Sequence, residues 1–398
     1  MKRVLILNPY LATLGGGEKQ MAHLCRFIEC YCNHQVQIEI VAFSDGTADE
    51  PGKNAVTMDT IMEKFNVRLR CTSIRKVEFS SQRSTMRIIK NLLTIGNMTR
   101  QYDVFINSMY FSKHIGRAKK NLYICMFPPK KFLWDPNDRF KCAAEKVLNV
   151  LFFHSYDLFL PISAFSNRWM ETYWKKSRKY EIVYPPVFSE DSVVGQYDEN
   201  EKKNIIISVG RFFVGGHCKK QLEMVQCFLD HEGVLGDYEY HLAGSVFQNE
   251  EKDVLYLSQV REIAQKSNRI FIHENCSFEA LISLYKQAKI FWHATGYGVD
   301  ENAEPDQMEH FGITTVEAMS YGVVPVVINQ GGQQEIVDEE KDGFLWCDEG
   351  EWIQKTVQVI QNEQKRKEMA VQAVEKAKRF SEEAFDQRYT KVFDGLRI

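Results

Sequence analysis

The sequence contains no apolar run long enough to cross a membrane, because no stretch reaches the roughly 18 uninterrupted apolar residues that a spanning helix needs. Its first apolar run, Val4–Leu7, is also too short for the core of a signal peptide. The ten cysteines form no CxxC pair and no metal-ligand spacing, which argues against a zinc site or a disulfide framework. These absences predict a cytoplasmic protein with reduced thiols.

Signatures of two cofactor-binding classes are missing as well. The glycines after the first apolar run do not form GxGxxG, and no GxxxxGK[ST] phosphate loop occurs. No acidic residue stands at the end of the second predicted strand, apart from Asp45 in a loop. The sequence therefore supports NAD binding only weakly and predicts no P-loop site.

The chain is long enough for two domains, and its charge is unevenly spread. A length of 398 residues exceeds one ordinary hydrophobic core, while 44% hydrophobic and 26% charged residues are typical of soluble globular proteins. Up to Pro185 the chain has 28 Lys and Arg against 16 Asp and Glu, and the remainder has 22 against 37. Two interpretations stay open for the basic half: it faces an anionic membrane or phosphate-bearing substrate, or it is a solvated surface.

Apolar runs and helical periodicity alternate through the first half, as in a βαβ pattern. The strands predicted there are Val4–Leu7, Val36–Phe43, Val104–Asn107, Leu122–Met126, Leu158–Pro161 and Ile182–Tyr184, and the helices include Glu18–Cys32, Lys141–Phe153 and Ala164–Tyr173. The pattern restarts after a polar stretch, with strands at Ile205–Val209, Tyr240–Ala243, Ile270–Ile272, Ile290–His293 and Val324–Ile328. Helices are predicted from Lys219 and at Val254–Lys266, Glu279–Gln287 and Thr314–Tyr321, and two charged helices within Glu351–Gly395.

This pattern predicts an α/β protein built from two Rossmann-like doubly wound domains that face each other across a cleft. We expect an N-terminal domain over residues 1–187, a linker over 188–203 and a C-terminal domain over 204–378. A last helix over 379–398 is expected to pack back on the N-terminal domain. In such sheets, ligands bind beyond the carboxyl ends of the strands.

Three stretches place glycines and charges where an anionic ligand would bind. Gly15–Gly17 follow the first strand, and Gly210-Arg211 leads through a Gly-containing loop to Lys219-Lys220 at a helix start. Gly312–Thr315 opens another helix, whose backbone N–H groups suit a diphosphate. Each stretch taken alone also fits a structural turn or a solvated helix end.

Together these stretches resemble the retaining GT-B glycosyltransferases of family GT4. The resemblance rests on Glu309-x7-Glu317 within EHFGITTVEAMSYGVVPVV, on Gly331-Gly332, on the three stretches above and on YPPV before the second domain, and it covers nearly the whole chain. EHFGI and GRFF…GH…K are most similar to Alg11-type mannosyltransferases and related bacterial surface-polysaccharide enzymes. The resemblance implies an N-terminal acceptor domain and a C-terminal nucleotide-sugar donor domain.

The resemblance also implies roles for individual residues. Arg211 and Lys219 would bind the donor diphosphate, with Lys220 as a rival because the loop Gly215–His217 looks like an insertion. Glu309 would hold the donor sugar hydroxyls and Glu317 the ribose hydroxyls. The remaining donor-side residues implied are Gly16, Gly17, His293, Gly312, Ile313, Thr314 and Thr315, with the loop Thr295–Gly298 beside them.

On the acceptor side the expected residues are Met126, Lys130 and Lys131. Met126 stands where related enzymes often carry a His, so that His is missing if the alignment holds. The stretches FPPKKFLW and Arg168–Tyr180 mix Lys and Arg with aromatic residues, which suits a membrane surface or a lipid-diphosphate acceptor. They also fit a plain exposed helix.

The function implied is retaining transfer of a hexose, with mannose from GDP-mannose favoured, to a glycan or lipid-linked acceptor. The enzyme is expected to be cytoplasmic or peripheral on a membrane. No metal is expected, since the sequence has no D-x-D, and no cofactor beyond a GDP- or UDP-sugar co-substrate. No nucleic-acid module is present. The alternatives are a UDP-sugar-dependent transferase, another GT-B enzyme such as an epimerase or phosphorylase, and a nucleotide-sugar binding protein without transferase activity.

Overall fold

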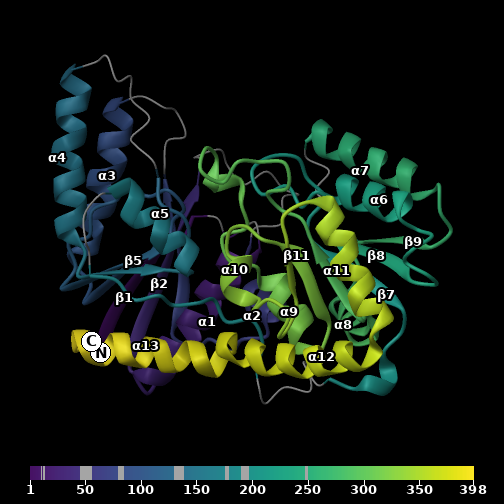
Figure 1. Ribbon diagram of the computed structural model, residues 1–398. Helices are drawn as coiled ribbons and strands as arrows, with labels where there is room; N and C mark the ends of the chain where they lie inside the picture. Colours follow the sequence, from purple (N-terminus) through teal and green to yellow (C-terminus); the bar gives the residue numbers. More distant parts are fainter. Residues whose placement is uncertain are drawn as a thin grey trace. The chain divides into compact units, whose positions relative to one another are not determined.

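The computed structural model describes residues 1–9, 11, 14–44, 56–78, 85–129, 139–174, 179–189, 197–246 and 250–398. The chain divides into two units, each with its own parallel sheet and helices on both faces (Figure 1). Unit 1 comprises Met1–Pro186 with Phe385–Ile398, and unit 2 comprises Val187–Ala384. The last stretch of the chain therefore belongs to the first unit.

Unit 1 has a six-stranded sheet in the order β3-β2-β1-β4-β5-β6. Its strands are β1 (Lys2–Leu7), β2 (Val36–Ser44), β3 (Thr72–Glu78), β4 (Val104–Asn107), β5 (Lys120–Cys125) and β6 (Leu158–Pro161). Its helices are α1 (Gly16–Tyr31), α2 (Met58–Phe65), α3 (Thr85–Thr99), α4 (Arg139–Ser155), α5 (Ala164–Trp174) and α13 (Glu382–Leu396), most of which lies in this unit.

Unit 2 repeats the same topology in the order β12-β11-β10-β7-β8-β9. Its strands are β7 (Ile205–Val209), β8 (Glu239–Gly244), β9 (Ile270–Glu274), β10 (Ile290–His293), β11 (Val324–Ile328) and β12 (Phe344–Trp346). Its helices are α6 (Gln221–Asp230), α7 (Glu251–Ala264), α8 (Phe278–Gln287), α9 (Ile313–Ser320), α10 (Gln333–Ile336), α11 (Glu349–Gln361) and α12 (Glu363–Ala377). Single turns of 3-10 helix occupy Glu199–Glu201, Pro305–Gln307 and Lys378–Phe380.

The central strands are buried on both faces, which explains why they read as continuous apolar runs. All four residues of β10 are buried, and so are all five of β11. In unit 2 a cluster of tryptophans fills the space between sheet and helices. Trp346 and Trp352 stack with ring centroids 4.5 Å apart, and Trp292 meets Trp352 edge-on at 4.8 Å.

The predicted α/β fold with two doubly wound units is confirmed, with corrections to single elements. The predicted strand Ile182–Tyr184 is wrong. The Val183 N–H does bond the Pro161 carbonyl at 3.0 Å, but Pro185 and Pro186 follow directly, and proline has no N–H for a sheet ladder. The edge strand β3 was missed because its charged residues hide the apolar alternation.

The C-terminal region also differs from the prediction, since it forms the three helices α11, α12 and α13 rather than two. Asn362 separates the first two, and its side-chain oxygen accepts the Lys365 N–H at 2.9 Å. Ser381 separates α12 from α13, and its hydroxyl accepts the Ala384 N–H at 3.2 Å. Both residues satisfy free N–H groups at a helix start, as N-caps do. Within the described part of the chain, no helix is long and apolar enough to span a membrane.

Candidate active site

The charged residues singled out in the sequence gather at the switch point of the unit 2 sheet. β7 and β10 are neighbours in the sheet. The next strand after β7 is β8 and the next strand after β10 is β11, and these two lie on opposite sides of the central pair. Gly210 and Arg211 follow the end of β7, and His293 is the last residue of β10. The helix α9, which begins just after Glu309, lies between β10 and β11 in the chain.

Glu309 is the centre of this cluster. Its carboxylate accepts a hydrogen bond from the Lys219 ammonium, and His293 Nε2 lies 3.1 Å from the same oxygen. The Glu309 side chain is 17% exposed, so the group is held near the surface but shielded from most water. Gly210 makes room for the lysine, because a Cβ at Gly210 would lie 2.6 Å from Lys219 Cγ.

The electrostatics of the cluster favour a charged glutamate and a neutral histidine. Burial alone raises the pKa of Glu309, but the Lys219 charge and the His293 hydrogen bond together hold that pKa well below its ordinary value. Burial lowers the pKa of His293, although Glu309 opposes this shift. The cluster therefore presents one carboxylate, one ammonium and one uncharged imidazole at neutral pH.

The loop between Gly210 and α6 brings two more groups to the cluster. His217 donates from Nδ1 to the Met308 carbonyl at 3.0 Å, and its ring meets His310 edge-on at 4.4 Å. Burial is the main cause that lowers the pKa of both imidazoles. Arg211 is exposed, lies over the Phe213 ring at 4.9 Å, and contributes to the lowered pKa of His217.

The structure separates the two adjacent lysines. Lys220 pairs with Glu223 of its own helix at 3.1 Å, whereas Lys219 faces Glu309. Lys220 is the N-cap of α6 and has the left-handed backbone conformation, with φ 59°. This turn of the backbone directs the two side chains to different carboxylates.

The N-terminus of α9 lies beside Glu309 in the chain. Gly312 is its N-cap, and the N–H groups of Ile313 and Thr314 lack intrahelical acceptors, as at the start of any helix. The Thr315 N–H already donates to the Gly312 carbonyl at 3.1 Å. The structure therefore leaves fewer free N–H groups at this end than the predicted run Gly312–Thr315 implies.

Glu317 lies one turn further along α9 and is half-buried. The Tyr285 hydroxyl donates to its carboxylate at 3.3 Å, and the Tyr285 ring stacks on Tyr321. Glu317 and Glu309 therefore have separate partners, Tyr285 for the first and Lys219 with His293 for the second.

Lys202 fixes the other end of α9. Its ammonium donates to the carbonyls of Ala288 and Tyr321, each at 2.8 Å, and so joins the C-termini of α8 and α9. A cation at two helix C-termini is favourable because both carry partial negative charge. Burial lowers the pKa of Lys202 to about 7.

Gln333 lies directly against the N-cap of α9. The residue is fully buried, and within the described residues neither its amide nitrogen nor its amide oxygen has a hydrogen-bond partner. A Cβ at Gly312 would lie 2.6 Å from Gln333 Nε2, and Gly312 has φ 121°. The position therefore requires glycine for both space and backbone conformation.

In unit 1 the residues implied by the sequence lie around the start of α1. Gly16 and Gly17 form its first turn, and the Gly15 N–H donates to Glu18 at 2.9 Å. The Met126 side chain packs on Gly17, where an added Cβ would lie 2.9 Å from Met126 Cε. Lys130 and Lys131, and the segment 175–178 of the predicted basic run, lie outside the described residues.

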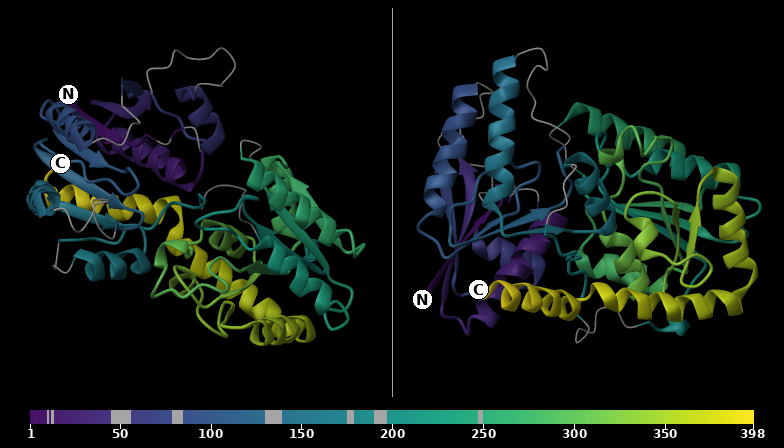
Figure 2. Two further views of the ribbon diagram at one scale, coloured as in Figure 1. Left: turned by 90° about the horizontal axis from the view of Figure 1, so that it is seen from above. Right: turned by 60° about the vertical axis from the view of Figure 1, so that its left-hand side comes forward.

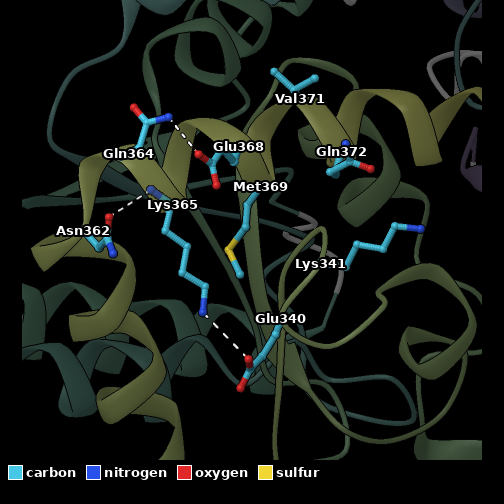
Figure 3. Close-up of a pocket in the computed structure, with 9 residues that line it drawn as sticks. All are labelled: Glu340, Lys341, Asn362, Gln364, Lys365, Glu368, Met369, Val371 and Gln372. Atoms are coloured by element: carbon cyan, nitrogen blue, oxygen red, sulfur yellow. Dashed lines mark hydrogen bonds and ion pairs between the residues drawn. The ribbon is translucent and has the colours of Figure 1, made fainter.

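A small cavity behind the unit 2 cluster is lined by Gly210, Lys219 and His293 together with buried side chains such as Trp292. A second hollow and the groups spaced for metal binding lie away from these residues. A shallow charged hollow lies along α12 near Glu340 and Lys365 (Figure 3). The Lys365 ammonium and the Glu340 carboxylate on its lining form an ion pair at 3.8 Å. Among the described residues, the groups spaced for metal binding are Glu29, His34 and Cys71, and Cys227, His231 and Glu349.

The sequence analysis assigns no role to three residues near this site, His217, His310 and Gln333. His217 lies in the loop Gly215–His217 and His310 directly follows Glu309, so a histidine close to the charged motifs is the signal that could have identified both. Gln333 follows Gly331-Gly332 and carries no sequence signal of its own.

Parts of the chain are similar to known proteins. Residues 190–380 match the model of the family described as glycosyl transferases group 1. Two curated relatives carry the name GDP-Man:Man(3)GlcNAc(2)-PP-Dol alpha-1,2-mannosyltransferase. The Dictyostelium discoideum protein is 28% identical over 242 residues, and the Caenorhabditis elegans protein is 25% identical over 245 residues. These alignments cover 56% and 58% of this chain but 44% and 50% of the relatives, so the chain spans about half their length.

Solved structures share the fold over the whole chain. Anabaena Alr3699/HepE, solved in complex with UDP and glucose, aligns with a TM-score of 0.69 at 14% identity, covering 99% of this chain and 100% of that one. A glycosyltransferase from Rickettsia africae aligns equally well at 15% identity, covering 99% of this chain and 98% of that one. At such low identity the likeness establishes the GT-B fold.

Proposed function

Because residues 190–380 match the model of the group 1 family of glycosyl transferases, we propose that the chain is a retaining, metal-independent hexosyltransferase. Its donor is a nucleotide diphosphate sugar, with GDP-mannose favoured, and its acceptor is a glycan or a lipid-linked glycan. The names of the two mannosyltransferase relatives support the donor and acceptor class.

The observation that carries the proposal is the Lys219–Glu309–His293 cluster beside the N-terminus of α9. A nucleoside diphosphate is an anion and a sugar is a polyol, and this site offers groups for both. Lys219 and the free N–H groups of the helix start suit the diphosphate. The Glu309 carboxylate suits the sugar hydroxyls.

The other charged groups complete the assignment. Arg211 would bind the diphosphate from the end of β7, where its exposed side chain is free to reach a ligand. Glu317 would accept hydrogen bonds from the ribose hydroxyls, with Tyr285 holding its carboxylate. Lys202 holds α9 in place from its far end.

In the reaction, the bond between sugar C1 and the diphosphate oxygen breaks through an oxocarbenium-like state. Negative charge grows on the departing diphosphate, where Lys219, Arg211 and the α9 N–H groups stabilise it. The acceptor hydroxyl forms the new bond to C1 on the same face. Its proton passes to the departing phosphate oxygen, so no side-chain base is required and Met126 is compatible with activity.

Thermal unfolding with GDP, UDP, ADP and their common sugar conjugates tests the donor site, because a ligand that binds only the folded state raises the melting temperature. We expect a shift with one nucleotide family, most with GDP and GDP-mannose, and loss of the shift in Glu317→Ala and Arg211→Ala. A shift with UDP compounds instead would assign the donor to the UDP-sugar class.

Transfer must then be measured with labelled donor and a membrane extract as acceptor source. Labelled product from the wild-type chain, absent in Glu309→Ala, supports the transferase. If the protein binds the donor but neither transfers its sugar nor hydrolyses it, the result would favour a nucleotide-sugar binding protein without transferase activity. No shift with any nucleotide would contradict the assignment of Glu309 and Glu317.

A further inference from the structure

The helix α4 of unit 1 exposes apolar side chains where a solvated helix carries polar ones. Val147, Val150 and Leu151 are 59%, 52% and 50% exposed, whereas Phe152 on the same helix is fully buried in the unit 1 core. Exposed apolar residues are ordinary when they are scattered singly, but a contiguous patch marks an interaction surface.

The spacing makes these residues one face. Positions i, i+3 and i+4 of a helix lie on the same side, so Val147, Val150 and Leu151 form a continuous stripe. Ala143, one turn earlier, is also exposed and in line with them. Phe152 faces the opposite way, which explains how α4 is anchored in unit 1 while its outer face stays apolar. We call Ala143, Val147, Val150 and Leu151 the α4 stripe.

The charge around the stripe selects its partner. Among the described side chains of α3 and α4, the charged ones are the exposed Lys90 and Lys146 and the half-buried Glu145, and the chain up to Pro185 has 28 Lys and Arg against 16 Asp and Glu. Figure 1 and the right-hand view of Figure 2 show the two helices side by side. Lys146, next to Val147, is exposed. An apolar stripe with basic residues near it is the composition of a helix that lies in the interface of an anionic bilayer.

A second exposed apolar pair provides the contrast. Val254 and Leu255 on α7 are 43% and 60% exposed, and the exposed charges before them are Glu250, Glu251 and Lys252, since Asp253 is buried. This pair therefore has similar apolar exposure without an excess of basic residues beside it.

We propose that the α4 stripe is a membrane-docking surface that lies in the headgroup region of an anionic bilayer. The inference rests on the proposed function for its purpose, because a lipid-linked acceptor is presented at such a surface. The stripe itself consists of residues outside the Lys219–Glu309–His293 cluster.

Flotation of the full chain with vesicles tests the proposal. We expect the wild type to float with vesicles of equal parts phosphatidylcholine and phosphatidylglycerol, and much less with phosphatidylcholine alone. The triple variant Val147→Glu, Val150→Glu, Leu151→Glu should lose about tenfold or more of this binding, since it removes apolar contact and adds repulsion. Val254→Glu, Leu255→Glu on α7 should float like the wild type.

Melting temperatures and the nucleotide-induced shift of each variant report on folding and on the donor site. If the triple variant unfolds, the milder Val147→Gln, Val150→Gln replaces it. The proposal is overturned if the wild type floats with neither vesicle, if the α4 variant floats as well as the wild type, or if the α7 variant loses as much binding. A wild-type dimer that the α4 variant converts to a monomer would assign the stripe to a second copy of the chain instead.

The two proposals can fail separately. Vesicle binding through α4 without any nucleotide shift would leave the surface standing and remove the glycosyltransferase assignment. A nucleotide-induced thermal shift and sugar transfer without vesicle binding would support the glycosyltransferase and remove the membrane-docking surface.

Discussion

At the residue scale, the clearest decision in the structure is between two neighbouring lysines. Lys219 meets Glu309, and Lys220 meets Glu223. Both have the same chemistry and nearly the same sequence context. Their roles differ only because the left-handed conformation of Lys220 turns the chain between them.

This difference gives the first prediction. Lys219→Ala should lower kcat/KM for sugar transfer by about 10²–10³, the loss typical of removing one preorganised charge-stabilising donor. Lys220→Ala should lower it far less, because its ammonium is engaged by Glu223. Steady-state kinetics of both variants with the identified donor measure the contrast, and equal losses would contradict the assignment of Lys219.

Asp342 provides a second prediction at this scale. Its carboxyl is fully buried, Oδ1 accepts the Asp338 N–H at 2.8 Å, and within the described residues Oδ2 has no partner. Burial raises its pKa to about 6 from an ordinary value of 3.8. Between pH 3.8 and about pH 6, the folded state therefore keeps a proton on Asp342 that the unfolded state has lost. The free energy of unfolding decreases as the pH rises through this range.

Asp342→Asn should remove that decrease, because the amide carries no charge. We expect the variant to be more stable than the wild type by about 1–3 kcal/mol at pH 8, and nearly equal to it at pH 4. Urea unfolding at the two pH values measures this. A variant that is destabilised at pH 8 would show that the carboxylate has a stabilising partner.

At the element scale, α9 is positioned from both ends. Lys202 holds its C-terminus through the Tyr321 carbonyl, and the packing of Gly312 against Gln333 fixes its N-terminus. The helix is only eight residues long, so its placement depends on these contacts more than on its own helix propensity.

The N-terminal contact predicts the effect of Gly312→Ala. The new Cβ would collide with the Gln333 amide, and the backbone at φ 121° would be strained, at a cost of about 1–3 kcal/mol. The displaced helix start should abolish the nucleotide-induced thermal shift. Gly236→Ala is the matched control, because Gly236 has φ 65° and nothing within 4 Å of an added Cβ. The control should keep the nucleotide shift; if it loses the shift as well, general strain and not helix placement is responsible.

At the scale of the whole molecule, the chain ends in the unit where it begins. Phe393 of α13 meets Phe27 of α1 edge-on at 5.4 Å, and Arg26 pairs with Asp386 at 2.8 Å. The Tyr31 hydroxyl also donates to Asp394 at 2.6 Å. The last helix is thus part of the unit 1 core.

Phe393→Ala should therefore destabilise unit 1 in particular. The loss of a fully buried ring costs about 3–5 kcal/mol. We expect unfolding followed by hydrogen exchange to show earlier opening of α1 and β1, with the strands of unit 2 protected as in the wild type. Val371→Ala on the exposed side of α12 is the control and should change neither unit. Equal loss of protection in both units would mean that they unfold as one.

The sequence by itself determined the two doubly wound sheets, because strands such as β10 and β11 are buried on both faces and must be apolar throughout. It also determined the acidic motif and the glycines that surround it. Strand β3 could not be read, since its charged side chains obscure the period-two pattern of an edge strand.

Only the tertiary structure decided which charges meet. Lys219, His293 and Glu309 are up to 90 residues apart in the chain, and their contact depends on β7 and β10 being neighbours. His217, His310 and Gln333 join this region through loop conformations that no periodic pattern encodes. Side-chain direction is set by the local backbone and by packing, so neither the lysine that faces Glu309 nor the amide that lies on Gly312 can be identified from spacing alone.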